Sequence, residues 1–522
     1  MMMKRLLSLV LVALLAVGLV PLVASAENVT LTVAVYERGN TTNTYGTVTD
    51  NYWTRWVQSE FGDPNGITVE YVPIPRSEDE AKFNTLMASG TAPDIIFSYN
   101  LSMIIGYGKD GGLTPLDELI EAYGPNIKEN LAASLPYGTY EGIQYTIPAV
   151  RSMTGRYSNY IRKDWLDRMG VELEVNEAGY YHMSVEAFEA LLYQAKELDL
   201  DETGMEMFPL GVPGAYNSTQ AKPLIFAFVD REGVSAEYAA AAPQMLWPGF
   251  KEGVRFLNKL YNDNLIDPDF MVDTDTATPS FNALVSTGRM LAFGHDDMYT
   301  NGLRALYETN AEADFVALQL DNVHGEQIIP TYAPTGMYVS VPATCKNPDA
   351  AVKYLNFLAD YDTYRVLAYG LEGIRYEMID GSPVDIEYTE EEKAGIESYE
   401  RITCGDMNLL FNGSPLNYAT SIIGKTYADA KIIELQEFSR SLSRVGEVPD
   451  YYFGGIRTEA EEKYSGFISN PEASLPLLIS CPAEEFDAQY DTVISNYLAQ
   501  GGQEILDQRI ALYHELEALK AK

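Results

Sequence analysis

Polar side chains follow two predicted strands at the points where those strands end. Residues 29–35 alternate between apolar and polar positions and predict the first strand, and the apolar run 95–97 predicts a second, buried strand. In α/β sheets, ligands bind outside the carboxyl ends of the strands, where hydroxyl, carboxylate, amide and guanidinium groups can form hydrogen bonds to them. The residues expected there are Tyr36, Glu37 and Arg38 after the first strand, and Ser98, Tyr99 and Asn100 after the second.

The elements that must position these groups alternate between helix and strand. The stretch 83–97 predicts a helix that Gly90 ends, a turn, and then the second strand; Asp94 is expected to fix that turn. An earlier helix begins near Trp53 and precedes a predicted strand at 67–71, which gives a strand, helix, strand order and an α/β fold class. Trp53 lies close to a loop and is a candidate for stacking on a ligand.

Residues 199–204 contain the first half of a calcium-binding loop. Asp199, Asp201 and Thr203 place oxygen ligands at positions 1, 3 and 5, and Gly204 stands at position 6. The second half does not follow, because apolar residues occupy positions 9 and 12. A bound calcium ion and a plain loop that ends a helix are therefore both open interpretations.

No arrangement typical of a catalytic site occurs in the sequence. HExxH and G-x-S-x-G are both missing, and the 4 histidines lack the spacing of metal ligands. Residues 106–111 spell G-x-G-x-x-G but do not follow the first strand, so they do not indicate a dinucleotide site. We therefore predict no catalytic residues and no required cofactor.

The composition indicates a large, acidic, globular protein. Its 522 residues are 46% hydrophobic, and 36 Lys and Arg against 75 Asp and Glu give a net charge of −39. This charge repels nucleic acid and anionic lipid, so neither is an expected partner. Cys345, Cys404 and Cys481 form no CxxC pair and allow either one disulfide with a spare thiol or three buried thiols.

The first 26 residues have the features of a signal peptide. Lys4 and Arg5 precede an apolar run at 6–23, and residues 24–26 have the small-x-small pattern of a cleavage site. We expect cleavage after Ala26 and an extracytoplasmic protein. An uncleaved anchor is the alternative, because the apolar run approaches the length of a membrane span.

Short motifs occur in a characteristic order along nearly the whole chain. They are ASGTAPD at 88–94, GLTPL at 112–116, YTIP at 145–148, IRKDWL at 161–166, NPDAA at 347–351 and GGQEI at 501–505. In order and spacing they resemble the extracellular solute-binding proteins of carbohydrate ABC importers, in the branch with the LplA-type lipoproteins and the alginate-oligosaccharide-binding proteins. The absence of a lipobox cysteine near residue 26 departs from Gram-positive members and favours release into a periplasm or the medium.

The resemblance implies a two-lobed periplasmic-binding-protein fold of type II, with hinge strands and a ligand cleft between the lobes. The chain crosses between lobes more than once in this family. We therefore expect lobe one at 27–150 and 325–372, and lobe two at 151–324 and 373–522 with a helical C-terminal region.

The resemblance also implies which residues line the cleft. Sugar recognition needs planar hydrogen-bonding groups and aromatic faces on a preformed surface. By position against the family, the further candidates beyond the two strand-end groups are Arg151, Trp247, His295, Asp296, Arg375 and Tyr376. Arg38, Arg151 and Arg375 raise the hypothesis of an acidic sugar, because arginine binds carboxylates through two parallel hydrogen bonds, whereas the acidity of the chain favours a neutral oligosaccharide.

The function implied is that of a monomeric, non-enzymatic receptor that captures a carbohydrate and delivers it to the permease subunits of an ABC importer. A secreted polysaccharide-degrading enzyme is the alternative, since the 75 acidic residues leave room for a catalytic carboxylate pair. A structural or adhesive module would contain repeats or low-complexity linkers, and the sequence has neither.

Overall fold

The structure, a computed structural model, describes residues 29–37, 46–151, 155–198, 206–215, 218–274, 278–296, 299–379, 382–399, 407–411, 427–464 and 470–520. The predictions that fall outside these residues are the signal peptide 1–26, Arg38, the calcium residues Asp199, Asp201 and Thr203, and the state of Cys404. Across the described ranges, none of the helices combines the length and the apolar character needed to cross a membrane.

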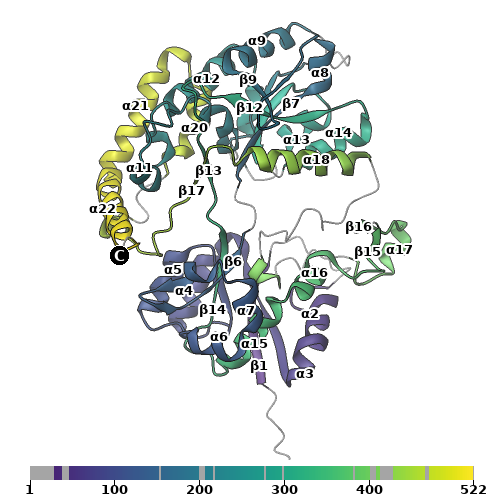
Figure 1. Cartoon of the computed structure of the whole chain (residues 1–522), viewed down its shortest axis with the longest axis vertical. Coiled ribbons are helices and arrows are strands. Elements are labelled where there is room, and N and C mark those ends of the chain that lie inside the picture. Colours follow the sequence, from purple (N-terminus) through teal and green to yellow (C-terminus); the bar gives the residue numbers. More distant parts are fainter. Residues whose placement is uncertain are drawn as a thin grey trace, which may run out of the picture.

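The chain forms two α/β lobes that lie one above the other along the long axis of the molecule (Figure 1). Buried apolar side chains between residues 31 and 149 and between 337 and 411 form the core of lobe one. Two further clusters, drawn from residues 160–328 and 428–506, form the core of lobe two. The two-lobed fold predicted from the sequence is confirmed, and each lobe is built around its own core.

The sheet of lobe one has the strand order β2-β1-β3-β14-β6. β1 and β2 pair in parallel, and a bridge between Val33 and Ile95 joins β1 to β3. β14 runs antiparallel to both of its neighbours, so the carboxyl ends of the other four strands lie at one edge. The bounds are β1 Val29–Glu37, β2 Ile67–Pro75, β3 Ile96–Ser98, β6 Ile147–Val150 and β14 Thr335–Ser340.

Helices pack around this sheet, and two short hairpins complete the lobe. The helices are α2 Tyr52–Val57, α3 Asp63–Asn65, α4 Asp79–Ser89, α5 Leu101–Lys109, α6 Asp117–Tyr123, α7 Pro125–Asn130, α15 Pro348–Leu358, α16 Tyr361–Tyr369 and α17 Glu390–Ala394. The hairpins are β4 Thr139–Tyr140 with β5 Ile143–Gln144, and β15 Tyr376–Ile379 with β16 Ser382–Asp385. Gly90 ends α4 with a left-handed φ of 68°, as the sequence predicts.

Lobe two is built on a six-stranded sheet with the order β10-β11-β7-β12-β9-β8. β11 runs antiparallel to β7 and places Asp296 opposite Tyr157, at the edge where the chain enters the lobe. The strands are β7 Tyr157–Arg162, β8 Glu174–Val175, β9 Tyr181–Ser184, β10 Leu210–Gly211, β11 Ala292–Asp296 and β12 Phe315–Asp321. The helices before the last crossing are α8 Lys163–Arg168, α9 Val185–Lys196, α10 Lys222–Phe226, α11 Ala236–Ala241, α12 Phe250–Asn262, α13 Pro279–Ser286 and α14 Asn301–Thr309.

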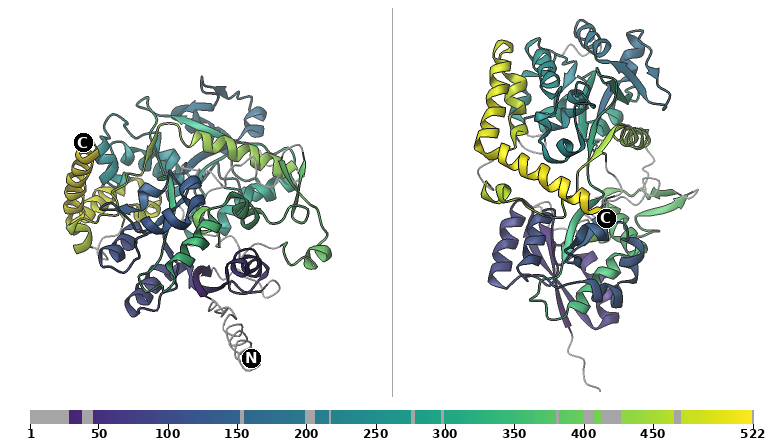
Figure 2. Two further views of the ribbon diagram at one scale, coloured as in Figure 1. Left: turned by 60° about the horizontal axis from the view of Figure 1, so that its bottom comes forward. Right: turned by 60° about the vertical axis from the view of Figure 1, so that its left-hand side comes forward.

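The elements of the C-terminal part of the chain are α18 Tyr427–Leu442, β17 Glu447–Pro449, α19 Glu459–Lys463, α20 Leu475–Ser480, α21 Phe486–Tyr497 and α22 Gln503–Lys520. Of these, α21 and α22 pack along one side of lobe two, whereas α18 lies on another side, near α14 (Figure 1 and Figure 2). β17 pairs in parallel with β13 (Ile329–Thr331) close to the hinge. Between β17 and α19, the Tyr452 hydroxyl donates a hydrogen bond to the Tyr137 carbonyl of lobe one, so this segment contacts both lobes.

Two of the crossings between the lobes lie later in the chain than the expected boundaries. Ile328 packs in the core of lobe two and β13 pairs with β17, so the return to lobe one comes after residue 331 rather than after 324. Residues 407–411 pack in the core of lobe one, so the last crossing follows them rather than residue 372. Short apolar segments carry no sequence signal for the lobe whose core they join.

The predicted turn at Asp94 is held by a reciprocal clamp to β1. The Asp94 carboxylate accepts hydrogen bonds from the Thr32 amide and hydroxyl, both at 2.8 Å, and the Thr32 hydroxyl in turn accepts one from the Asp94 amide at 2.9 Å. Burial, with Asp94 nearby, raises the pKa of the Cys345 thiol to about 12. Cys345 and Cys481 are both free thiols, so they do not pair with each other.

We expect Asp94→Ala to lower the free energy of unfolding by about 2 kcal/mol, because the amide and the hydroxyl of Thr32 lose their carboxylate acceptor. Urea denaturation followed by circular dichroism measures the loss. Asp110→Ala, at an exposed carboxylate at the end of α5, is the matched control and should be near neutral. Equal losses in the two variants would contradict the clamp.

Candidate functional site

The sheets of the two lobes present strand ends toward the same hinge region. In lobe one, the parallel strands end at residues 37, 75, 98 and 150, all on the edge where β14 begins. In lobe two, β11 ends at Asp296 on the edge where β7 begins. These two edges lie on either side of the hinge (Figure 1), which is the arrangement predicted for the ligand site.

An arginine lies between two tyrosines at the edge of lobe one. The Arg76 guanidinium is 4.8 Å from the ring centroid of Tyr36 and 5.2 Å from that of Tyr99. Asp79 accepts a hydrogen bond from the Tyr36 hydroxyl at 2.5 Å and one from Arg76 at 3.4 Å. Burial, reinforced by Asp79, raises the pKa of Tyr36. Tyr36 is only 1% exposed, so Arg76 and Tyr99 are the members of this cluster that offer surface to a ligand.

Arg76 was missed by the sequence analysis, and the reason is the pair of prolines before it. Pro73 and Pro75 interrupt the alternation that predicted a strand at 67–71, whereas β2 continues through Pro75 in register with β1. β2 is an edge strand, where the missing N–H of proline is tolerated. A predicted strand that continued through Pro73 and Pro75 would have placed Arg76 directly after its end.

The hinge contains two arginines on one tyrosine ring. The guanidinium groups of Arg151 and Arg156 lie 4.3 and 4.1 Å from the ring centroid of Tyr332. Arg156 also forms an ion pair with Asp450. The Arg151 backbone amide donates to the Pro334 carbonyl at 3.1 Å, while its half-buried guanidinium has no carboxylate partner among the described residues. Arg151 therefore keeps hydrogen-bond donors for a ligand.

At the edge of lobe two, His295 is a packing residue and Asp296 lies at the strand end. His295 is 8% exposed and stacks near Tyr299 with ring centroids 4.2 Å apart. Its Nδ1 accepts a hydrogen bond from the Asp296 amide at 2.7 Å. Burial lowers the pKa of His295 to about 3, so the ring is neutral at physiological pH. Asp296 remains partly exposed beside Gln220, whose side chain accepts from the same amide.

Two residues after β3 serve the local fold. Ser98 is 1% exposed, and its hydroxyl accepts a hydrogen bond from the Asn100 amide at 2.9 Å. The Asn100 side chain caps α5 by accepting from the Met103 amide at 3.1 Å. Their polar atoms are thus used within lobe one, whereas Tyr99 is partly exposed at the strand end. Glu37 is exposed at the end of β1.

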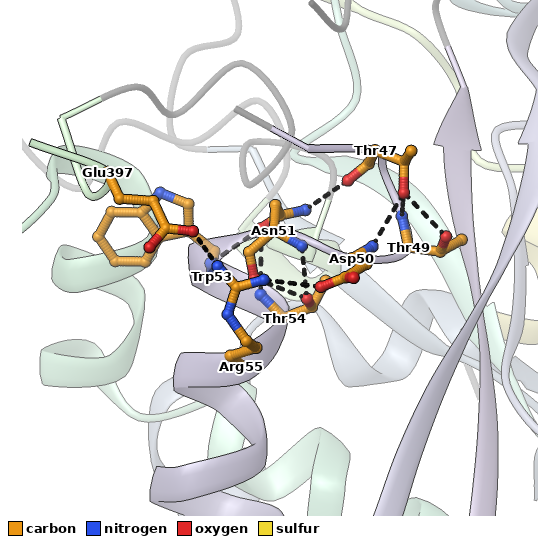
Figure 3. Close-up of polar contacts among 8 residues, drawn as sticks. All are labelled: Thr47, Thr49, Asp50, Asn51, Trp53, Thr54, Arg55 and Glu397. Atoms are coloured by element: carbon orange, nitrogen blue, oxygen red, sulfur yellow. Dashed lines mark hydrogen bonds and ion pairs between the residues drawn. The ribbon is translucent and has the colours of Figure 1, made fainter. Parts of the chain in front are cut away.

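Trp53 does not face a ligand surface. It is 1% exposed and packs in the core of lobe one, edge-on to Tyr52 and Trp56. Figure 3 shows the start of its helix, where the Asn51 side chain accepts from the Trp53 amide at 2.8 Å. Helical spacing could not separate the buried ring of Trp53 from the partly exposed ring of Trp56.

Arg375 and Tyr376 lie on the β15–β16 hairpin. Arg375 forms an ion pair with Asp385 at 3.4 Å and stacks on Tyr399 at 4.4 Å, and Tyr376 is 4% exposed. The same region is tied to α2 of lobe one through the ion pair of Arg55 with Glu397 (Figure 3). Arg375 is therefore already engaged, and the predicted grouping of arginines is reduced to Arg151 within the described residues.

Trp247 belongs to a different part of the molecule. It lines a cavity inside lobe two, next to η6 (Gln244–Leu246), and none of the strand-end residues of lobe one lines that cavity. Gly106 and Gly108 lie inside α5, so the G-x-G-x-x-G sequence forms no phosphate-binding turn before a helix. Within the described ranges, no group of three His, Cys, Asp or Glu side chains could hold a metal ion, and the calcium loop stays a prediction.

Comparison with known proteins gives consistent matches. Residues 45–363 match the bacterial extracellular solute-binding protein family. The chain is similar to lipoprotein LipO of Bacillus subtilis (strain 168), 23% identical over 333 residues that span 60% of this chain and 63% of LipO, just under two thirds of its length.

Solved structures share the fold. The alginate-binding protein AlgQ2, in a crystal structure without calcium ion, is 16% identical with a TM-score of 0.62 and covers 94% of this chain and 99% of its own. The N-glycan transport solute-binding protein NgtS from Streptococcus pneumoniae is 17% identical with a TM-score of 0.61 and covers 93% of this chain and 98% of its own.

His295 makes the stability of the protein sensitive to acid. The unfolded chain binds a proton at this residue below about pH 6.5, whereas the folded protein does not until about pH 3. Above about pH 6.5 this difference in proton binding has no effect on the free energy of unfolding. Below that pH it lowers the free energy of unfolding by about 1.4 kcal/mol per pH unit. We expect His295→Asn to flatten the fall in stability between pH 6.5 and 4, as measured by urea denaturation. Parallel pH profiles for the variant and the parent protein would contradict this.

Proposed function

Because the chain belongs to the bacterial extracellular solute-binding protein family, we propose that it captures a carbohydrate, most simply a neutral oligosaccharide, between its two lobes and delivers it to the permease of an ABC importer. The named relatives support the ligand class, since alginate and N-glycans are both carbohydrates. The family description supports an extracytoplasmic location, to which the predicted signal peptide would direct the chain.

The observation that carries the proposal is the pairing of tyrosine and arginine groups at the facing strand edges. Tyr99 offers an aromatic face, and Arg76 and Arg151 offer planar sets of N–H donors. Sugar rings need both kinds of group, an aromatic face for their C–H side and planar donors and acceptors for their hydroxyls. Asp296, on the opposite lobe, supplies an acceptor for those hydroxyls.

The two-lobed form suits a receptor that closes on its ligand. The first two crossings lie side by side at the hinge, and Arg151 and Arg156 from one crossing contact Tyr332 from the other. Hinge residues of this kind absorb a change of backbone angle while each lobe keeps its own core. We infer that the closed form is monomeric and that the permease recognises it.

A panel of neutral and acidic oligosaccharides, read by thermal shift with analysis of the recovered sugar, tests this function. We expect at least one sugar to raise Tm, because a ligand at a hundred times its Kd stabilises the folded state by about 2.7 kcal/mol. The sugar should be recovered unchanged. Cleavage of the stabilising sugar would instead indicate a degrading enzyme.

Arg151→Ala should weaken the binding of that sugar by about tenfold or more, because it removes charge-assisted hydrogen bonds at the hinge. Isothermal titration calorimetry measures the affinity. Arg168→Ala, which removes an exposed arginine on α8, is the matched control and should bind like the parent protein. An unchanged affinity in Arg151→Ala would remove this residue from the site.

A further inference from the structure

Lobe two contains a polar cavity of about 620 Å³ beside the hinge. Its walls come from α11, η6, β13, β17, α19, α21 and α22, so the C-terminal helices close it on one side. Of the hinge residues described above, Arg156 and Asp450 also line this cavity, whereas Arg151 does not. Tyr99 and Arg76 of lobe one do not line it either. The cavity is therefore a separate place from the site between the lobes.

Buried hydrogen-bond donors without acceptors line this cavity. The Trp247 indole nitrogen is buried without a hydrogen bond, and the whole residue is 4% exposed. The Nε atom of Arg156 is likewise buried without a hydrogen bond. Both residues line the same cavity, and each unpaired atom is a donor. Since buried donors are nearly always paired in folded proteins, their state points to a ligand that supplies acceptors.

Among the charged residues that line the cavity, one cation has no carboxylate partner. Arg156 pairs with Asp450, Lys222 with Glu472 at 2.5 Å, and Arg509 with Glu461 at 3.4 Å. The fourth cation that lines the cavity, Arg457, is exposed and has no ion pair or hydrogen bond among the described residues. An excess positive charge in a chain of net charge −39 is unusual, and one negative charge on a ligand would balance it.

The wall also contains the amide side chains of Gln244 and Asn470, and a set of apolar and aromatic residues. It includes the alanines at 239–242, Pro243, Pro449, Tyr464 and Tyr497. A ligand with one charged end and a small, less polar body would thus have contacts for both parts.

We propose that this cavity is a second binding site, specific for a small monocarboxylate. The carboxylate accepts hydrogen bonds from the Trp247 indole and the arginine N–H groups, and it neutralises Arg457. The site is independent of the sugar site, so it stands whether or not the proposed transport function is correct.

The test uses isothermal titration calorimetry on the whole protein with acetate, D-glucuronate and D-glucuronamide. The last compound keeps the shape of glucuronate and removes its charge. We expect saturable binding of at least one carboxylate, with glucuronamide bound at least tenfold more weakly. Acetate alone would mark a site for simple carboxylates, and glucuronate alone a site for sugar acids. No saturable binding of either carboxylate, or equal binding of glucuronate and its amide, overturns the proposal.

Two variants place the binding in this cavity. Trp247→Phe keeps the ring and removes the N–H donor, and Arg457→Gln removes the unpaired charge from an exposed position. Each should weaken carboxylate binding by at least fivefold, while Arg168→Ala, at an exposed arginine on α8, should leave it unchanged. Should Trp247→Phe lower the ligand-free Tm, Arg457→Gln alone decides, because an exposed side chain does not support the fold. Full carboxylate affinity in Arg457→Gln, or competition between the carboxylate and the stabilising sugar, overturns the assignment.

Discussion

An inner strand of the lobe-one sheet, β14, comes from a part of the chain that is reached only after most of lobe two. β14 lies between β3 and β6, and Thr335 pairs with Val150 although the sheet of lobe two lies between them in sequence. The sheet of lobe one is therefore incomplete until the chain has left the lobe and returned at the same edge. This antiparallel pairing sets Arg151 beside Pro334 and brings the first two crossings together. The hinge and the orientation of both strand edges follow from it.

The hydrogen-bond needs of the fold decide which strand-end groups remain for a ligand. Short polar side chains lie close to the backbone and accept hydrogen bonds from its amides. Ser98 accepts from a neighbouring amide, and Asn100 caps a helix. Longer side chains reach beyond the backbone. Arg76 lies against two aromatic rings and still keeps 42% of its side chain exposed, and Arg151 lies against Tyr332 with its donors unpaired among the described residues. Arginine and tyrosine are therefore the groups that we propose for ligand recognition, and the strand-end rule alone does not distinguish them from the others.

Helices and strands could be predicted because their ends depend on neighbouring residues. The candidate site could be predicted only in part, because it depends on pairing between segments that are distant in the sequence. Gly90 ends α4, as its sequence context predicts, because the end of a helix depends on a few neighbouring residues. Arg76 depends on the register of β2 with β1, which a proline-containing stretch conceals. Arg375 faces Asp385 and Tyr399 because a hairpin folds back on itself after the last strand of the main sheet. The two-lobed fold was recognisable from the resemblance, but the lobe that takes up a short apolar segment depends on packing alone.

Trp247 illustrates how burial and chemistry together assign a residue that sequence position misassigns. A tryptophan before a helix looks like a surface for a sugar, yet its ring is buried in lobe two and its N–H has no acceptor. A buried ring alone would indicate core packing, as it does for Trp53. The difference is the cavity at its edge and the excess of donors and positive charge that surround it. Three carboxylates hold Arg156, Lys222 and Arg509 around this one space. The Lys222–Glu472 pair is buried, and burying an ion pair is costly unless close geometry and further hydrogen bonds compensate for the lost solvation, so this arrangement is not that of an ordinary apolar core.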